Sequence, residues 1–379
     1  MCNAADTLSE VAIALSLSLH QTGSLRRRAN VLDKLEFVTT SDIDGGAIPG
    51  LELDLQADDS YSGIYQGKYP VVIYHCEPDM LAYTLYMTTG HEDFLEELEI
   101  EEDVYEDEEE IFDTLELPYI VPELREVSID EIQGGDEIME VSDIKGILHA
   151  HSTYSDGAHT LREMASYCKE QGYTYLGITD HSMAAFYANG MKPHDVERQH
   201  NEIDVINKEI ADFKIYKGIE VDILSDGSLD YDEATLSSFE FVIASIHSSL
   251  TMTESKAMNR LIRAIQSPYT DMLGHATGRL LLARKGYPID HTKVIDACAA
   301  NDVAIEINSN PYRLDIDWRW INYCLEKGVK LSINPDAHQM AGIHDVKWGA
   351  MIARKGGLTA QDCICCMSSD DFGTWLKRK

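Results

Sequence analysis

The sequence predicts an α/β protein, a seven-stranded (β/α) barrel preceded by a small α+β domain. From residue 145 onward, seven short apolar runs alternate with helical segments, as β/α units do. These runs are apolar throughout, which suits a parallel sheet buried on both faces. Residues 1–90 combine a helical segment near 7–18 with short strand-like runs. They therefore predict a separate α+β domain with an antiparallel sheet.

The composition is typical of a globular protein, with 44% apolar and 26% charged residues. No run of apolar residues is long enough to predict a transmembrane helix. The stretch "VAIALSLSL" near the start is too short for one, and it lacks the basic flank of a signal peptide. We therefore expect a cytoplasmic protein that does not contact a membrane, with reduced cysteine thiols rather than disulfides.

The charge is strongly negative and unevenly distributed. The formal net charge is −35, and most of the excess lies in residues 91–140. We expect this stretch to be a solvated acidic helix or linker; a nucleic-acid mimic or an arm for an unknown protein partner is the alternative. Such charge repels phosphate backbones, so tight non-specific DNA binding is not expected. The predicted division is a domain at 1–90, an acidic segment and linker at 91–144, and the barrel at 145–379.

Reactive side chains lie at the end of each predicted strand of the barrel. Because the carboxyl ends of parallel β/α strands converge on one mouth, we expect these side chains to meet. Residues i and i+2 of a strand point the same way, which pairs His149 with His151 and Asp336 with His338. In strand order the set is His149 and His151, Asp180 and His181, Glu220 and Asp222, His247, His275, Asn308 and Asn310, and Asp336 and His338.

A dry cluster of this many imidazoles and carboxylates would be destabilised by repulsion and desolvation. Bound divalent cations resolve the conflict, and the mixed ligand set suits zinc, manganese or iron. One histidine at a strand end is usually structural, but six at successive strand ends predict a metal site. Clustered ions favour phosphoester hydrolysis, with amide hydrolysis as the competitor. Arg279, Arg284 and Arg313 favour a phosphoester over an amide as the substrate, although each could equally form a surface ion pair.

Together these motifs resemble the polymerase and histidinol phosphatase (PHP) domain, in the form appended to bacterial family X DNA polymerases. The matching segments are "LHAHSTYSDG", "LGITDHS", "KGIEVDIL", "GSLDY", "VIASIHS", "GHATGRLL", "EINSNPYRLD" and "DAH". The resemblance covers nearly all of residues 145–379. It implies a distorted seven-stranded barrel that binds about two to three divalent ions, Mn²⁺ or Zn²⁺.

The resemblance also implies a role for each ligand. Asp336 and His338 are expected to take part in catalysis as well, together with Arg279. Pro335 stands where the family usually has threonine; it removes a backbone donor but no ligand. The implied ligands are His149, His151, Glu220 and Asp336 for a first ion, Glu220, His247 and His275 for a second, and Asp156, His181 and His338 for a third.

The N-terminal part resembles the palm of the same polymerases. "GSLRRR" is similar to their triphosphate-binding turn, and "LPYIVPELRE" to their link into the PHP domain. The positions of the three catalytic aspartates carry Lys34, Glu36 and Val72 here. These side chains cannot build a two-metal polymerase site. The resemblance therefore implies a degenerate palm, whose basic turn could still bind an anion or be structural.

The leading hypothesis is a metal-dependent phosphoesterase without polymerase activity. The resemblance implies 3′–5′ exonuclease or 3′-phosphatase activity, with single-stranded DNA or DNA 3′ ends bound weakly. The alternative enzyme is a small-molecule phosphatase acting, for example, on histidinol phosphate. The alternative of another class is a non-catalytic metal-binding interaction protein. The thiols of "CICC" at 363–366 are expected to be structural and to lie in a terminal helix.

Overall fold

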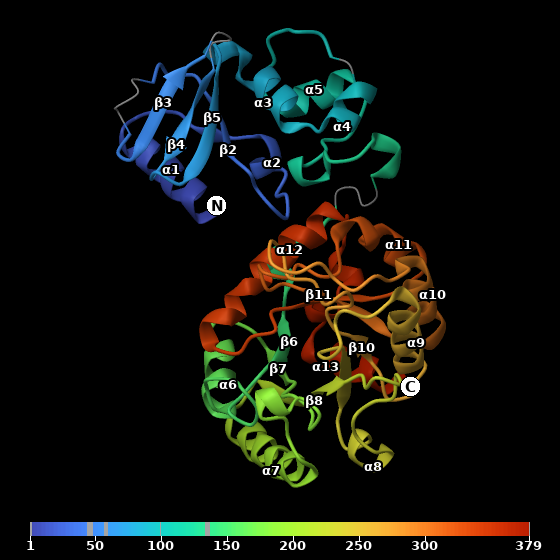
Figure 1. Ribbon diagram of the computed structural model, residues 1–379. Coiled ribbons are helices and arrows are strands. Elements are labelled where there is room, and N and C mark those ends of the chain that lie inside the picture. Colours follow the sequence, from blue (N-terminus) through green and yellow to red (C-terminus); the bar gives the residue numbers. More distant parts are fainter. Residues whose placement is uncertain (1, 44–47, 57–59, 99, 133–136, 379) are drawn as a thin grey trace. The chain divides into compact units, whose positions relative to one another are not determined.

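The computed structural model describes residues 2–43, 48–56, 60–98, 100–132 and 137–378 (Figure 1). The chain divides into two compact units, Met1–Gly135 and Asp136–Lys379. Among the described residues, no helix is both long and apolar enough to cross a membrane. The division into three parts at residues 90 and 144 stays a prediction, and residues 133–136 of its linker lie outside the described residues.

The first unit is built on a five-stranded sheet with the order β1-β2-β5-β4-β3. β2 and β5 are parallel, whereas the other neighbouring strands are antiparallel. The expectation of an antiparallel sheet was therefore wrong for this pair, because the apolar pattern of a strand does not encode the direction of its neighbour. The strands are β1 (His20–Gln21), β2 (Leu35–Thr39), β3 (Leu51–Leu55), β4 (Tyr61–Tyr65) and β5 (Tyr69–His75).

One apolar helix forms the core of this unit together with the sheet. Leu8 and Ala12 of α1 are fully buried and belong to the same core cluster as Phe37 of β2. The helix begins and ends earlier than the predicted range 7–18. The helices of the unit are α1 (Cys2–Ala14), α2 (Gly23–Arg26), α3 (Leu81–Thr89), α4 (Glu92–Glu97) and α5 (Glu108–Thr114).

The acidic segment is more than a solvated helix or linker, which corrects the expectation from its charge. Phe94 and Phe112 of this segment are fully buried. Glu108 is also buried, and its carboxylate pairs with the guanidinium groups of Arg26 and Arg125. Arg125 is itself fully buried and lies 5.0 Å from the centre of the Phe112 ring. Apolar residues spaced among the acids thus fold the segment onto α3 and α2.

The second unit is a nearly closed barrel of seven parallel strands, as predicted. Its sheet has the order β12-β11-β10-β9-β8-β7-β6, and every neighbouring pair is parallel. The two edges approach each other where the His151 amide donates to the Ala337 carbonyl at 2.8 Å. The strands are β6 (Gly146–Ala150), β7 (Tyr175–Ile178), β8 (Lys214–Asp222), β9 (Phe241–Ser245), β10 (Met272–Leu273), β11 (Ala304–Asn308) and β12 (Leu331–Asn334).

Helices surround these strands (Figure 1). α6 shows why they form: Thr160 and Glu163 make a capping box at its start, and its buried residues recur at the spacing of one helix face. The helices are α6 (Leu161–Glu170), α7 (Pro193–Glu209), α8 (Glu233–Leu236), α9 (Glu254–Ile265), α10 (His291–Asn301), α11 (Ile321–Glu326), α12 (Val346–Lys355) and α13 (Ser369–Trp375).

A second apolar cluster occupies the opposite face of the strands from the helix-packed core. It contains Tyr175, Tyr216 and Phe241 from three neighbouring strands, together with Ile364 and Phe372 from the C-terminal segment. Aromatic side chains therefore fill the interior near the amino ends of the strands. The "CICC" segment contributes a short 3-10 helix, Ile364–Cys366, rather than the expected terminal helix; its first two cysteines are buried and the last is half-buried.

Candidate metal centre

The alternation of side chains along β8 places a carboxylate at the open end of the barrel. Tyr216, Gly218 and Glu220 lie two residues apart and so point to the same face. Tyr216 belongs to the interior aromatic cluster. At Gly218 a Cβ atom would lie 2.4 Å from the Phe241 ring, so only glycine fits there. Glu220 is the next residue on this face, beyond the aromatic layer, and it is 1% exposed.

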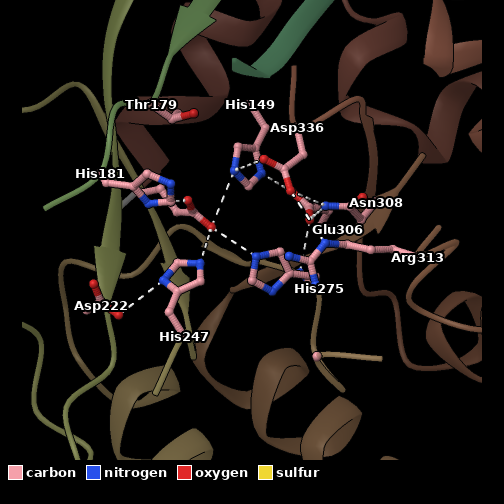
Figure 2. Close-up of polar contacts among 12 residues, drawn as sticks. His149, Thr179, His181, Asp222, His247, His275, Glu306, Asn308, Arg313 and Asp336 are labelled. Carbon is pink, nitrogen blue, oxygen red and sulfur yellow. Dashed lines mark hydrogen bonds and ion pairs between the residues drawn. The ribbon is translucent and has the colours of Figure 1, made fainter. Parts of the chain in front are cut away.

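Four imidazoles surround the Glu220 carboxylate. Its Oε1 lies 3.0 Å from His275 Nε2, 3.1 Å from His247 Nε2 and 3.4 Å from His149 Nε2. Its Oε2 lies 2.9 Å from His181 Nδ1. Figure 2 shows the rings of His149, His247 and His275 converging on one carboxylate from three different strand ends. The position of Glu220 suits a carboxylate shared between ions.

A second carboxylate, Asp336, follows β12 beside the histidines of β6. Its Oδ1 lies 3.1 Å from His151 Nε2 and 3.5 Å from His149 Nε2. The two imidazole rings lie 5.3 Å apart between centroids. Pro335 therefore does not displace Asp336 from the cluster. The three side chains form a group whose ligand atoms all lie within 4.8 Å of one another.

The third carboxylate, Asp156, lies at the more exposed side of the cluster. Its Oδ1 is 3.4 Å from His338 Nε2 and 3.7 Å from His181 Nε2. The side chain of Asp156 is 31% exposed and that of His338 is 40% exposed, whereas Glu220 is buried. This side of the site is where a ligand from solvent can reach the cluster.

The structure brings all nine predicted ligands into one connected cluster. Several of their polar atoms are buried and make no hydrogen bond within the described residues. A buried polar atom without a partner is costly unless an ion or water satisfies it. The donor set thus fits divalent cations by its chemistry. The atoms concerned are His149 Nε2, His151 Nδ1 and His275 Nδ1, together with His181 Nδ1 and Glu220 Oε2, whose 2.9 Å contact lacks the angles of a hydrogen bond.

The electrostatics of the cluster shift the pKa values of two of its histidines in opposite directions. Burial lowers the pKa of His247, but Glu220 and Asp222 outweigh it and raise that pKa to about 10. For His151, burial and the neighbouring His181 lower the pKa to about 3. Burial raises the pKa of Glu220, yet the surrounding histidines hold it well below its usual range. Glu220 is therefore ionised and available as a ligand.

The backbone at two predicted ligands adopts conformations that side-chain-bearing residues rarely take. His149 has φ of 114° and Asp336 has φ of 52°. The register of β6 against β7 shifts between Leu148 and Ala150, as at a β-bulge. Bulges re-aim side chains beside functional sites, and strained residues cluster there. The bulge accounts for the convergence of His149 and His151 better than simple strand alternation does.

A carboxylate outside the predicted set holds one of the histidines. Glu306 is fully buried, and its Oε2 lies 2.5 Å from His149 Nδ1. It also accepts from the His275 amide and from the side-chain amides of Asn308 and Asn334. Glu306 lies two residues before Asn308 on β11, so the alternation that selected Asn308 could have found it. Such carboxylates fix the orientation of metal-binding histidines.

Two of the three arginines predicted to favour phosphate, Arg279 and Arg313, differ in their surroundings. The Arg279 guanidinium donates to the carbonyl of Arg313 at 2.9 Å and to Asp317 Oδ2 at 2.7 Å, so it is already bound by the loop that follows β11. Arg313 Nε instead lies 3.6 Å from Asp336 Oδ2, and Figure 2 shows its side chain reaching the cluster. A catalytic role for Arg279 stays a prediction, whereas the geometry favours Arg313 as the phosphate partner.

In the first unit, the residues at the predicted polymerase positions interact with one another. Glu36 and Val72 are register partners on the parallel strands β2 and β5. The Glu36 carboxylate accepts from the amide and the hydroxyl of Ser24, each at 3.0 Å, and Lys34 Nζ lies 2.9 Å from Glu36 Oε1. An internal carboxylate therefore occupies the donors of the turn that resembles a triphosphate site.

Comparison with protein families decides the identity of the barrel. Residues 148–310 match the family model described as PHP domain. These residues are a PHP domain. The match begins at Leu148 within β6, next to the first predicted ligand, and extends past the end of β11. The resemblance inferred from the strand-end motifs is thereby confirmed.

The chain is similar to curated proteins with two different descriptions. It is 42% identical over 273 residues to the DNA polymerase/3′-5′ exonuclease PolX of Bacillus subtilis, a match covering 72% of this chain and 48% of that protein. It is 27% identical over 249 residues to a protein of Thermoanaerobacter sp. described as a probable phosphatase, covering 61% of this chain and 94% of the relative. The chain thus spans about half the length of the polymerase relative.

Solved structures with lower similarity include two histidinol phosphatases. A putative histidinol phosphatase from Listeria monocytogenes has a TM-score of 0.42 and 14% identity, covering 52% of this chain and 97% of its own. The histidinol phosphate phosphatase of Lactococcus lactis, solved with zinc, L-histidinol and phosphate, has a TM-score of 0.41 and 16% identity, covering 57% and 94%.

Proposed function

We propose that this chain is a metal-dependent phosphoesterase that acts on DNA 3′ ends, as a 3′–5′ exonuclease or a 3′-phosphatase. The observation that carries the proposal is the buried Glu220 carboxylate, which four histidine nitrogens approach within 3.4 Å. The PHP domain match and the phosphatase and exonuclease relatives support hydrolysis of a phosphoester.

The nine clustered side chains would hold about two to three divalent ions, manganese or zinc. The ions, when bound, would neutralise the phosphate and lower the pKa of a water molecule. Asp156 and His338, on the exposed side of the cluster, would face the entering substrate. Arg313 would orient the phosphate through its guanidinium, which presents planar donors that match phosphate oxygens.

Of the two alternatives, only the first has specific support. The relatives described as probable phosphatases favour a small phosphomonoester as substrate. A non-catalytic metal-binding protein would keep the ligands without turnover, but the exposed Asp156 and His338 give a substrate access to the cluster.

One experiment separates these possibilities. Manganese-loaded protein is incubated with labelled single-stranded DNA, 3′-phosphorylated DNA and histidinol phosphate, and metal content is measured in parallel. We expect about two to three ions per chain and release of nucleotide or phosphate from the DNA substrates. His149→Ala should abolish turnover, whereas His194→Ala, on the exposed face of α7, should not. A chain that binds no metal would overturn the proposal, and turnover of histidinol phosphate alone would favour the small-molecule phosphatase.

The first unit is proposed to lack polymerase activity. Lys34, Glu36 and Val72 offer no pair of carboxylates for two ions, and Glu36 occupies the donors of Ser24. Nucleotide added to any primer-template should therefore not be incorporated, and incorporation would refute this part of the proposal.

A further inference from the structure

The loop between β7 and α7 is firmly held at both ends. The Ser182 amide donates to the Glu220 carbonyl at 3.0 Å, and the Met191 amide donates to the His181 carbonyl at 2.8 Å. In between, the Ala184 amide donates to Asp230 Oδ2 at 2.6 Å. At Gly190 a Cβ atom would lie 1.9 Å from the Ser182 carbonyl oxygen. The loop is therefore tied directly to the two ligands Glu220 and His181.

Within this loop, two alanines are buried and the two aromatic residues between them are exposed. Ala185 and Ala188 are 1% exposed, whereas Phe186 is 85% exposed and Tyr187 is 60% exposed. Isolated apolar residues on a surface are common. Two adjacent aromatic rings held in solvent by a pinned loop, however, forgo burial that would otherwise stabilise the fold. Their position points to a ligand that covers them.

The aromatic pair lies beside the metal centre. The Tyr187 ring centroid is 6.3 Å from that of His181 and 6.4 Å from that of His247. Phe186 extends the surface away from the centre, with its ring centroid 6.2 Å from that of Tyr187. A phosphoester held at the cluster would therefore place the group next to its phosphate within reach of these rings.

We propose that Phe186 and Tyr187 form a stacking site for the terminal nucleobase of a nucleotide chain whose phosphoester lies at the metal centre. The inference rests on the proposed phosphoesterase function and names the group that the substrate carries. Aromatic side chains bind bases of any sequence by stacking on their faces. With phosphate held at the cluster and near Arg313, the exposed rings select substrates that carry a flat aromatic group next to the phosphate.

Removing one ring tests the site. Two single-stranded oligonucleotides are compared, one complete and one whose terminal residue lacks its base, with manganese-loaded protein. Stacking of one base corresponds to about a fivefold to 150-fold preference for the complete strand. Phe186→Ala and Tyr187→Ala should lose that preference through a higher KM, while turnover of the abasic strand stays unchanged. Phe186→Trp should retain it, and Val205→Ala, which removes an exposed apolar side chain from α7, is the matched control.

A second measurement does not depend on turnover. Stacking quenches the fluorescence of 2-aminopurine placed at the end of the strand, so wild-type protein should quench it and Phe186→Ala should not. Suppose that wild-type protein quenches the fluorophore and Phe186→Ala does not, even though no phosphoester is hydrolysed. In that case the proposed function fails while the stacking site stands. Variants that keep both the quenching and the preference for the complete strand would overturn the stacking site.

Discussion

At the scale of single residues, His149 depends on the Glu306 carboxylate for its orientation. The contact between His149 Nδ1 and Glu306 Oε2 leaves Nε2 facing Glu220 and Asp336. Glu306→Gln keeps the shape but removes the charge that fixes the tautomer. We expect metal affinity about 10-fold to 100-fold lower, measured by calorimetric titration with manganese, and turnover largely restored at saturating metal. Glu170→Gln, exposed on α6, is the control; unchanged affinity in Glu306→Gln would contradict a positioning role.

The raised pKa values of two histidines predict how protons compete with metal. Burial lowers the pKa of His338, but Asp156 and Asp336 outweigh it and raise it to about 9; that of His247 is about 10. In metal-free protein both rings are therefore protonated at neutral pH, and binding must release their protons. Apparent manganese affinity should rise with pH up to about 9 to 10, with proton release seen in buffers of different ionisation enthalpy. A pH-independent affinity would contradict this.

The same shifts affect the stability of the metal-free protein. The folded-state pKa of His247 lies above the ordinary value of 6.5. The ion pairs of the protonated ring therefore stabilise the fold fully below pH 6.5. Their contribution is lost as pH rises from about 6.5 through 10. The melting temperature of chelator-treated protein should therefore fall over this range. It should fall less in His247→Gln, and an equal fall in both proteins would exclude His247 as the cause.

The convergence of the candidate ligands could be predicted from the sequence because histidine and aspartate are rare at successive strand ends by chance. Glu306 shares a strand face with Asn308 but lies before the strand end, so a search confined to strand ends missed it, and the sequence does not show that His149 is its partner. Arg279 was predicted to take part in catalysis because the sequence cannot show that its guanidinium is already bound by the loop that follows β11. Both errors concern partners supplied by distant segments.

At the scale of elements, the barrel strands were predictable and the acidic segment was not. Seven apolar runs fix seven strands because each is buried on both faces. The β-bulge at His149 leaves no mark in the apolar pattern. In residues 91–140 the many acids hid the burial of Phe94, Phe112 and Glu108. The buried Glu108 carboxylate pairs with Arg26 and Arg125, and the acidic pattern gives no sign of these partners.

That ion pair gives a stability prediction for α5. Arg125 is fully buried and donates to Glu108 Oε1 at 2.5 Å and to the Ile120 carbonyl at 2.8 Å. In Arg125→Ala, the buried Glu108 carboxylate loses one of its two guanidinium partners. Breaking a buried pair from one side costs about 3–5 kcal/mol. Hydrogen exchange should show faster opening of α3 and α5, whereas Arg162→Ala, which breaks an exposed pair with Glu209, should have little effect.

At the scale of the whole molecule, the net charge of −35 opposes the proposed substrate. A single-stranded oligonucleotide is itself a polyanion, so it must approach against long-range repulsion. The Debye length falls from about 30 Å at 0.01 M salt to about 8 Å at 0.15 M. At saturating manganese, kcat/KM for an oligonucleotide should therefore rise as salt is added over this range, because screening removes repulsion faster than it weakens the contacts inside the site.

A small phosphomonoester provides the comparison for that experiment. Glycerol phosphate carries few charges, so its kcat/KM should change much less over the same salt range. Proteins that hold nucleic acid in a basic groove behave in the opposite way and lose affinity steeply with salt, because bound phosphates release counterions. A fall in kcat/KM for the oligonucleotide would thus reveal a basic groove that outweighs the net charge. A rise in kcat/KM for the oligonucleotide alone would instead mean that the metal centre and the aromatic pair, rather than long-range attraction, select the substrate.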